Sequence, residues 1–568
     1  MRYVLLDDQG TGRQFVFRNP ERLITANHRD DLPRAFADIE AAQRSGKWLA
    51  GQMAYELGQA LETRFKAPTG PLLQFGVFTN PTYHPPIDWL YTRDIPKLDF
   101  TPQLSEAEYL ARFEAVQNYL KSGDCYQVNL TFPMYAKSNA TPAQIYAAFR
   151  RRQPGRYGGI ISLGGADIVS FSPELFFERK GQNMRMRPMK GTRPRDPDPK
   201  IDAALLSDMQ AEPKSRAENL MIVDLLRNDL SRLCTAGSVK VPELFALETY
   251  PTLHQMTSQV TGVLREAVGW DDIMTSLFPC GSVTGAPKIR AMEIIKELED
   301  TPRRAYCGSI GYIAPTGDAS FSVAIRTVQM QDGEIRYDVG SGVVLDSNGP
   351  DEYRECLLKS RIFETPTEGV IETFRQNSTG DIPRAELHQK RISAMIGEDT
   401  AGRIYTSLPS VSNEDQRIRI MARDGQLTSQ ISPLKKFDMP LSLALSRYAL
   451  SKDVQETRFK TTFRDFYDGE RVRVTTLTQT DEVIFLNAAE EICEGSFTSL
   501  FIEKDGQLLT PAQSSGLLAG VLRQELIEKG DAVEAVLSLS DIKAADNIFV
   551  GNSLRGLMPA KFIDFLRH

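Results

Sequence analysis

Hydrophobic and polar positions in the first two thirds of the chain form short alternating runs, separated by longer runs with helical spacing. Residues 126–135 alternate apolar and polar side chains, as a half-buried strand does. Ser105 is predicted to cap a helix, because acidic residues and an amphipathic run to Leu120 follow it. Further strands are predicted at 160–163, 168–172, 175–179, 308–313, 321–330 and 335–339, and further helices at 217–230, 286–298 and 351–363. Strands followed by helices, without regular βαβ alternation, predict an α+β fold with antiparallel sheets flanked by helices.

A break in this pattern lies near residues 364–369. Pro366 and Gly369 follow a helical run there and precede a new strand pattern. The break predicts two domains, residues 1–365 and 366–568. In the second domain, strands are predicted at 370–375, 483–486, 498–503 and 547–550, and helices at 385–395 and 517–528. Residues 400–440 give no readable pattern.

Composition narrows the class of protein. The chain has 568 residues, 41% of them hydrophobic and 25% charged, and this globular composition excludes a disordered chain. The net charge of −7 does not favour a general nucleic-acid binder. The sequence has no run of about 18 apolar residues, and its start does not resemble a signal peptide, so neither a membrane span nor secretion is expected. The six cysteines lie at least 27 residues apart, which fits reduced thiols in a cytoplasmic protein.

Three carboxylates form one candidate site in the first domain. Glu352 and Glu355 are three residues apart and share one face of a predicted helix. Together with Glu218, from another helix, they can form an all-oxygen site of the kind that magnesium prefers. The alternative is a solvated acidic helix face.

Lys190 is a candidate nucleophile. It lies between Arg187 and the pair Arg193 and Arg195, and a lysine that is crowded by cations loses its proton more readily. A neutral amine attacks electrophilic carbon. The alternative is a surface lysine in a basic loop.

Nine ordered motifs between Gly123 and Lys359 carry a family resemblance. They are GDCYQVNLT, SFSPELFF, PMKGTRPR, AENLMIVDLLRNDL, PCGSVTGAPKIRAMEIIKELE, YCGSIGY, FSVAIRT, VGSGVVLDS and DEYRECLLK. In this order they resemble the chorismate-utilising enzymes, which include anthranilate, isochorismate and aminodeoxychorismate synthases. A weaker match, WLAGQMAYELG at residues 48–58, extends the resemblance towards the N-terminus.

The resemblance implies a role for each matching residue. Glu218 and Glu355, with Glu352 beside them, match the Mg²⁺ ligands that hold a substrate carboxylate. Glu174 matches the general acid that protonates the departing C4 hydroxyl. Chorismate is a dianion, so its site needs cations and free N–H groups. The positions matching the substrate site are Gln127, Gly191, Thr192, Tyr306, Arg326, Gly340, Gly342 and Lys359.

Two positions separate the branches of this family. Members that add water carry a lysine base where this chain has Gln127, so the chain resembles an ammonia user. Lys190 stands where anthranilate and isochorismate enzymes usually carry alanine, and it resembles the aminodeoxychorismate synthase branch. In that branch the lysine attacks C2 and expels the C4 hydroxyl, and ammonia then attacks C4 and releases the lysine. An anthranilate synthase is the alternative that Lys190 argues against. Gln255 departs from the family, because many relatives have histidine there.

The resemblance also implies a partner. The family takes ammonia from a glutamine amidotransferase, which needs a nucleophilic cysteine in a glycine-rich turn and a histidine. None of the six cysteines has this setting, so a separate amidotransferase subunit or free ammonium is expected.

Residues 369–560 resemble the fold-type IV pyridoxal phosphate enzymes, which include branched-chain aminotransferases and aminodeoxychorismate lyase. The motifs are ETFRQ, HQKR, KTTFR, EEICEGSFTSLF, TPAQSSGLLAGVLR and NSLRG. The resemblance implies an α/β domain that binds pyridoxal 5′-phosphate, in which Lys460 forms the Schiff base and Glu494 pairs with the pyridine nitrogen. The phosphate would be held by Arg391, the backbone amides of Val521 and Leu522, and Ser553.

The two halves together imply a bifunctional cytoplasmic enzyme of 4-aminobenzoate and folate synthesis. The first half would aminate chorismate, and the second would eliminate pyruvate as a lyase. A C-terminal aminotransferase and a non-catalytic scaffold domain are the alternatives, and the motifs alone do not separate lyase from aminotransferase. By analogy a homodimer through the C-terminal domain is expected, with no nucleic acid or membrane as partner.

Overall fold

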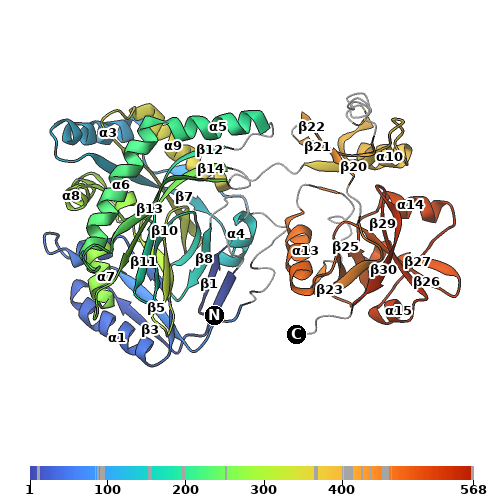
Figure 1. The fold of residues 1–568 in the computed structure, drawn as a ribbon, viewed down its shortest axis with the longest axis horizontal. Coiled ribbons are helices and arrows are strands. Elements are labelled where there is room, and N and C mark those ends of the chain that lie inside the picture. The colour runs from blue at the N-terminus through green and yellow to red at the C-terminus, as the bar shows by residue number, and fades with distance from the viewer. Residues whose placement is uncertain are drawn as a thin grey trace. The chain divides into compact units, whose positions relative to one another are not determined.

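The computed structural model divides the chain into two compact units, Met1–Thr365 and Pro366–His568 (Figure 1). None of the helices it describes combines the length and the apolar composition needed to cross a bilayer. The described residues are 1–8, 13–83, 85, 89, 96–150, 156–194, 199–249, 253–363, 369–398, 401, 414–423, 426–434, 437–450, 460, 461 and 464–563.

The first sheet of unit 1 is antiparallel and contains strands from both ends of the unit. Its centre is the long pair β7–β19, in which Gly342 lies opposite Asn129 and Gly340 opposite Thr131. In pairing order the strands are β15 (Gly285–Ala286), β7 (Gln127–Lys137), β19 (Glu334–Val343), β18 (Thr327–Gln331), β9 (Asp167–Ser172), β8 (Tyr157–Ser162), β1 (Tyr3–Asp8) and β2 (Arg13–Arg18), and β6 (Thr101–Pro102) also pairs with β7.

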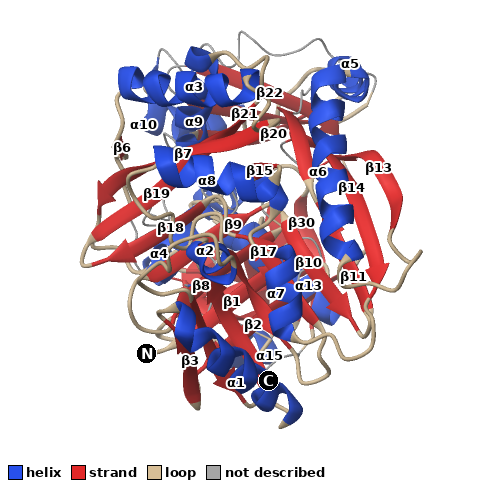
Figure 2. Cartoon of the chain, turned by 90° about the vertical axis from the view of Figure 1, so that its left-hand side faces the viewer, coloured by secondary structure: helices blue, strands red, loops and turns tan. Residues whose placement is uncertain are grey.

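The second sheet of unit 1 is also antiparallel, and it carries the Lys190 strand. Figure 2 shows helix α6 lying along β14, which is flanked by β13. In pairing order the strands are β12 (Met189–Pro194), β14 (Leu253–Val263), β11 (Asn183–Arg187), β10 (Leu175–Lys180), β17 (Ala319–Val323), β16 (Ser309–Ile313), β4 (Trp48–Met53), β5 (Leu73–Phe78) and β3 (Arg22–Ala26), and β13 (Lys240–Thr249) also pairs with β14.

Helix boundaries in unit 1 follow local capping chemistry. At the start of α3, Ser105 accepts from the Glu108 N–H, and the Glu108 carboxylate accepts from the Ser105 N–H, as expected for the predicted cap. The helices are α1 (Leu32–Arg44), α2 (Glu56–Leu61), α3 (Glu106–Lys121), α4 (Pro142–Phe149), α5 (Pro199–Ala211), α6 (Pro213–Ser231), α7 (Trp270–Leu277), α8 (Lys288–Leu298) and α9 (Gly349–Ser360), with short 3₁₀ turns at Arg29–Asp31, Gly281–Val283 and Arg361–Phe363.

An aromatic cluster holds α3 and α9 against β7. The ring centroids of Tyr109 and Phe132 are 5.6 Å apart, those of Tyr109 and Tyr353 are 5.3 Å apart, and those of Phe132 and Tyr353 are 5.7 Å apart. Aromatic pairs at these separations add to the stability that burial gives. The cluster therefore fixes α9, which carries Glu352 and Glu355, relative to the sheet.

The predicted strand 321–330 is wrong, because this segment is two strands in different sheets. Strand β17 ends at Val323 in the second sheet, and β18 begins at Thr327 in the first. Arg326, in the turn between them, has a φ of 53°, a left-handed conformation that interrupts extended backbone. Periodicity could not reveal the break, because apolar residues continue through it.

Unit 2 has a three-stranded antiparallel sheet and a larger mixed sheet. The small sheet is β20 (Val370–Gln376), β21 (Gln416–Arg423) and β22 (Gln426–Pro433), so the unreadable stretch 400–440 contains two strands. In the large sheet, β23 pairs in parallel with β24 and with β30, and β27 with β28. Its order is β25 (Ile492–Gly495), β24 (Glu482–Asn487), β23 (Leu441–Leu450), β30 (Gly556–Phe562), β29 (Asn547–Asn552), β26 (Ser499–Lys504), β27 (Gln507–Pro511) and β28 (Val533–Ala535).

The predicted helix 517–528 is wrong at its start. Helix α14 begins only at Val521, and Gly520 is its N-cap with extended backbone. The apolar run from Leu517 suited a helix, but two glycines flank it, and glycine weakens helical propensity. The other helices of unit 2 are α10 (Ala385–Ile396), α13 (Asp465–Thr478) and α15 (Leu539–Lys543), with a 3₁₀ turn at Gln513–Ser515.

Candidate active sites

Lys190 lies where three strands and one helix of unit 1 converge. Its ammonium is 3.9 Å from a carboxylate oxygen of Glu218 on α6. A Cβ atom added to Gly342 of β19 would lie 3.3 Å from Lys190 Nζ and 3.3 Å from Nε2 of Gln127 on β7. The structure therefore brings together four predicted residues, Lys190, Glu218, Gln127 and Gly342. Glycine at 342 leaves the space open between the amine and the amide.

The side chain of Gln127 has a buried amide group that can hydrogen-bond to a polar ligand. It is fully buried, and neither its Oε1 nor its Nε2 has a hydrogen-bond partner in the described part of the chain. Buried polar groups in proteins are almost always hydrogen-bonded, because leaving one unpaired costs about 1–3 kcal/mol. An orphaned amide beside Lys190 therefore marks a binding position.

Glu174 is a buried carboxyl group whose charged form is disfavoured. Burial raises its pKa to about 7, opposed by the Ser282 hydroxyl and by the positive charge of Lys190. Its Oε1 has no hydrogen-bond partner among the described residues. The Glu174 N–H donates to Ser172 Oγ at 3.2 Å, and its carbonyl accepts from the Val323 N–H at 3.1 Å. A carboxyl group fixed in this way can donate a proton near neutral pH.

Two residues of this site were missed from the sequence. Ser282, in the PCGSVTGAPK motif, acts on Glu174 as described above, and its hydroxyl lies 3.2 Å from the Cys280 sulfur. Gln255 donates from Nε2 to the carbonyl of Gly191 at 3.0 Å, where the backbone takes a positive φ of 75°. Gln255 stood out in the sequence only as a departure from relatives, and Ser282 had no such signal.

The predicted magnesium ligands are not assembled as a three-carboxylate cluster. Among the described residues, no group of three or more His, Cys, Asp or Glu side chains is placed to hold a metal. Glu355 pairs with Lys359 at 2.7 Å, and the Lys359 ammonium also donates to the Gly340 carbonyl at 2.7 Å. Glu352 is buried on the same helix. A metal at Glu218 and Glu355 would have to displace the ammonium groups of Lys190 and Lys359.

The remaining predicted substrate residues lie in the strands of unit 1 or in the turns between them. Tyr306 is buried just before β16, and burial raises the pKa of its hydroxyl well above the usual value. Arg326 is half-buried between β17 and β18, and its carbonyl accepts from the Phe171 N–H at 3.0 Å. Gly191 is in β12 with Thr192, whose side chain lies outside the described residues.

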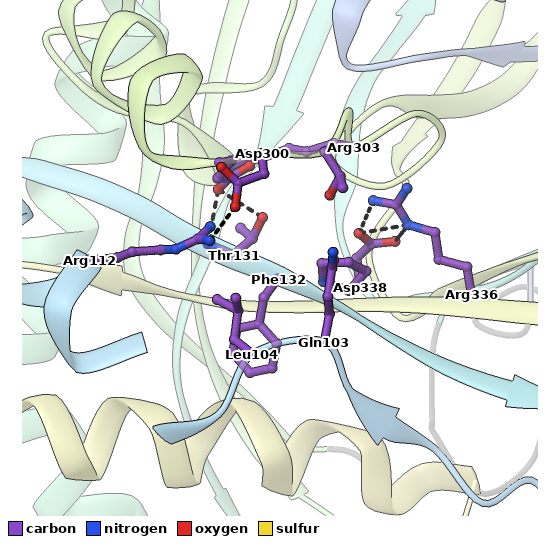
Figure 3. Close-up of a pocket in the computed structure, with 12 residues that line it drawn as sticks. Gln103, Leu104, Arg112, Thr131, Phe132, Asp300, Arg303, Arg336 and Asp338 are labelled. Atoms are coloured by element: carbon purple, nitrogen blue, oxygen red, sulfur yellow. Dashed lines mark hydrogen bonds and ion pairs between the residues drawn. The ribbon is translucent and has the colours of Figure 1, made fainter. Parts of the chain in front are cut away.

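A buried ion-pair network holds β7 at Asn129 and Thr131, and several of its residues are drawn in Figure 3. The Arg303 guanidinium donates to Glu299 at 2.7 and 2.8 Å and to the carbonyls of Asn129 and Val283 at 2.7 and 3.0 Å. Glu299 in turn accepts from the Thr131 N–H and hydroxyl. The cavity among these groups has a volume of about 10 Å³, so it holds one water at most. The ion-pair network joins β7, which carries Gln127, to the segment that carries Ser282.

Lys460 is the centre of the second site, in unit 2. Its carbonyl accepts from the Ile371 N–H at 2.7 Å, which joins it to the edge of β20. Burial and the positive charges of Arg464, Arg391 and Arg419 together lower its pKa to about 7, and the negative charge of Glu372 opposes them. A lysine with this pKa is largely neutral just above pH 7 and can react with a carbonyl group.

Arg391 is held in place by a buried carboxylate. Both oxygens of Glu372 accept from the Arg391 guanidinium, and Glu372 Oε1 also lies 2.6 Å from His388 Nδ1. Burial would raise the pKa of Glu372, but Arg391 and His388 together lower it to about 2. The remaining Arg391 nitrogen donates to the Ala519 carbonyl at 3.2 Å, directly before the start of α14.

The start of α14 fits a phosphate group. The backbone N–H groups of Val521 and Leu522 are buried and make no hydrogen bond within the described structure. A Cβ at Gly520 would lie 2.6 Å from Ser499 Oγ, so the backbone approaches closely there. Free N–H groups at a helix N-terminus, with Arg391 adjacent, form an anion site. Ser553 is half-buried, and its carbonyl accepts from Arg384 at 3.2 Å.

Glu494 is a buried carboxylate on β25. It accepts from the Tyr467 hydroxyl at 2.7 Å and from the Leu518 N–H at 3.1 Å. These bonds orient the carboxylate as a partner for a protonated ring nitrogen. The residues present at Lys460, Arg391, Glu494 and α14 therefore fit pyridoxal phosphate.

The two units match two families. Residues 90–365 match the chorismate binding enzyme family, and residues 369–563 match the amino-transferase class IV family. The chain therefore joins a chorismate binding enzyme domain to a class IV aminotransferase domain.

Its relatives refine this assignment. The chain is 42% identical over 278 residues to aminodeoxychorismate synthase component 1 of Escherichia coli, covering 48% of this chain and 61% of that protein. It is 39% identical over 267 residues to anthranilate synthase component 1 of Streptomyces coelicolor, covering 47% and 52%. The chain thus spans half to three fifths of these relatives. The solved anthranilate synthase component I of Streptococcus pneumoniae shares the fold, with a TM-score of 0.53 at 23% identity, covering 64% of this chain and 90% of that one.

Proposed function

We propose that the chain makes 4-aminobenzoate from chorismate in two steps. Unit 1, residues 1–365, aminates chorismate at C4 to give 4-amino-4-deoxychorismate. Unit 2, residues 366–568, then eliminates pyruvate. The observation that carries the first step is the convergence of Lys190, the orphaned Gln127 amide and the protonatable Glu174 around the opening at Gly342.

In the first step, Lys190 forms a bond to C2 of chorismate, the ring double bond shifts, and the C4–O bond breaks. The hydroxide leaves as water with the proton of Glu174. Ammonia then attacks C4, the double bond shifts back, and the C2–nitrogen bond to Lys190 breaks. The nucleophile determines the position of the amine, because an attack by ammonia itself at C2 would give anthranilate. The chain is similarly identical to an aminodeoxychorismate synthase and to an anthranilate synthase, so the overall identity does not separate these two activities. The assignment to C4 amination therefore rests on Lys190.

The class IV domain is a pyridoxal phosphate domain, and the bound cofactor supplies an electron sink for the second step. In this proposal Arg391 and the amides of Val521 and Leu522 hold the phosphate, Ser553 lies beside it, and Glu494 holds the ring nitrogen. Lys460 removes the proton from C4 of aminodeoxychorismate. The C3–O bond then breaks, the side chain departs as enolpyruvate, which takes up a proton to become pyruvate, and the ring becomes aromatic. An aminotransferase would use the same lysine, so the lyase assignment is supported by the substrate that unit 1 makes.

The remaining components follow from the same proposal. We propose that Mg²⁺ binds Glu218, Glu355 and Glu352 only together with a substrate carboxylate, because Lys190 and Lys359 hold two of these residues otherwise. Calorimetric titration of magnesium with and without chorismate tests this coupling. Ammonia comes from a separate glutamine amidotransferase, and unit 2 forms a homodimer, in the cytoplasm.

One assay tests both steps. The purified chain is incubated with chorismate, magnesium, ammonium and pyridoxal phosphate. Its products are separated by chromatography, then identified and quantified by mass spectrometry. The proposal predicts 4-aminobenzoate and pyruvate in equal amounts. Anthranilate as the product would overturn the first step, and accumulated aminodeoxychorismate would overturn the second.

A further inference from the structure

Arginine side chains crowd the second site beyond those assigned to the cofactor. Arg391 is bound to Glu372, and Arg464 donates to the Ser496 carbonyl. Arg417 and Arg419 differ from these two, because neither guanidinium group forms a hydrogen bond or an ion pair in the described part of the chain. Both are half-buried on strand β21.

The strand register places both arginines on the face that Lys460 shares. Thr373 lies opposite Arg419, and Arg375 lies opposite Arg417. Side chains two residues apart on a strand point to the same face, about 7 Å apart, and directly paired residues share a face. Lys460 is joined to β20 at Ile371, two residues before Thr373. Ile371 lies between Lys460 on one side and Met421 of β21 on the other. Arg419 is thus two strands across and one residue pair along this face from Lys460, and Arg417 is one pair further along.

The electrostatics agree with this placement. Burial lowers the pKa of Arg419, and the positive charges of Arg417 and Arg464 lower it further. Asp468 on α13 opposes this effect, but it makes no ion pair with Arg419 among the described contacts. Burial and Arg417 likewise lower the pKa of Arg555, whose guanidinium lies 4.6 Å from the Phe437 ring centroid. Two guanidinium groups that are close together and are not ion-paired form a site for an anion with two charges.

We propose that Arg417 and Arg419 bind the two carboxylates of the substrate that reacts at Lys460, and so select a dicarboxylate for this site. This inference rests on the proposed function and deepens it, because aminodeoxychorismate carries two carboxylates. A monocarboxylic amino acid would leave one guanidinium unpaired in a partly buried site. The pair of arginines therefore favours the lyase substrate over the apolar amino acids that many aminotransferases accept.

The test compares Arg417→Gln and Arg419→Gln with the control Arg375→Gln. Arg375 projects from the same face, but its guanidinium is already paired with Asp415 at 2.5 Å. With added aminodeoxychorismate as substrate, each test variant should raise KM about 10- to 100-fold, the usual effect of losing a charge-assisted hydrogen bond, and change kcat much less. The control should stay within about twofold of the unmodified chain. The affinity for pyridoxal phosphate, titrated by absorbance, should be unchanged in all three variants.

A second probe separates this inference from the proposed function. Chorismate has both carboxylates but no amine, so it can bind at Lys460 without reacting, and its binding is read from the absorbance of the cofactor in unit 2. Weaker chorismate binding in both test variants supports the arginine assignment, whether or not the unmodified chain produces 4-aminobenzoate. Failure to produce it overturns the proposed function alone. Unchanged KM and unchanged chorismate binding overturn the arginine assignment, as does a loss of cofactor affinity, which would assign these arginines to the phosphate.

Discussion

The two lysine centres of this chain have opposite electrostatic surroundings. Lys190 faces the carboxylate of Glu218, the carboxyl group of Glu174 and an unpaired amide. Lys460 faces Arg464, Arg391 and Arg419, and its pKa is lowered to about 7. The difference fits two kinds of chemistry. A site that expels hydroxide needs an acid beside the nucleophile, whereas a lysine that reacts with a cofactor carbonyl needs cations that favour its neutral form.

Removing Lys460 should give the largest effect. Lys460→Ala removes the base of the second step, so conversion of added aminodeoxychorismate should fall by about 10³-fold or more. Chromatography of the products measures this, and consumption of chorismate by unit 1 is the internal control. Undiminished 4-aminobenzoate would mean that the reaction does not depend on this lysine.

Removing Lys190 should block the amination by unit 1 and leave unit 2 active. Lys190→Ala should lower formation of aminodeoxychorismate by about 10³-fold, as the loss of a catalytic nucleophile does. The amination that remains should occur at C2 and give anthranilate, because ammonia then has no competitor there. Conversion of added aminodeoxychorismate should be unchanged. A variant that still aminates at C4 would contradict the role given to Lys190.

Glu174 should limit the first step at high pH. Burial raises its folded-state pKa to about 7, so the carboxyl group is protonated below this pH and ionised above it. Formation of aminodeoxychorismate should therefore decline as pH rises through about 7. Glu174→Gln should lower the rate by about 10²-fold or more and remove this decline. If the rate of the Glu174→Gln variant still declines as pH rises through about 7, another group causes the decline.

Glu372 should have the smallest of these effects, on cofactor binding. Glu372→Gln removes the charge that orients Arg391, so the dissociation constant for pyridoxal phosphate should rise about 10-fold. Titration by absorbance measures it. Glu386→Gln, at an exposed position on α10, the helix that carries Arg391, is the control and should bind the cofactor normally. If the two variants bind pyridoxal phosphate with equal affinity, Glu372 does not contribute to the phosphate site.

Much of the fold could be predicted from local signals. The Ser105 cap marked the start of α3, and the alternation at 126–135 marked β7. The break at Arg326 and the late start of α14 could not be predicted from periodicity. The first depends on the transfer of the chain from one sheet to the other, and the second on the extended backbone at Gly520. Motifs identified Lys190, Gln127 and Glu174, whose convergence rests on contacts between distant segments.

The residues missed from the sequence act through neighbours that are distant along the chain. Ser282 affects Glu174 across more than 100 residues, and Gln255 fixes the backbone at Gly191 across 64 residues. Arg417 and Arg419 lie in a segment for which no element was predicted, although polar and apolar residues alternate within β21 as in a half-buried strand. The strand register relates both arginines to Lys460, and the charge of Arg419 acts on its pKa.

Trapping the first intermediate tests the central claim most directly. The chain is incubated with chorismate and magnesium without ammonium, digested and analysed by peptide mass spectrometry. The account predicts an adduct on Lys190 with the mass of chorismate less one water, and the adduct should disappear when ammonium is added. An unmodified Lys190 in a preparation that aminates chorismate at C4 once ammonium is supplied would contradict it.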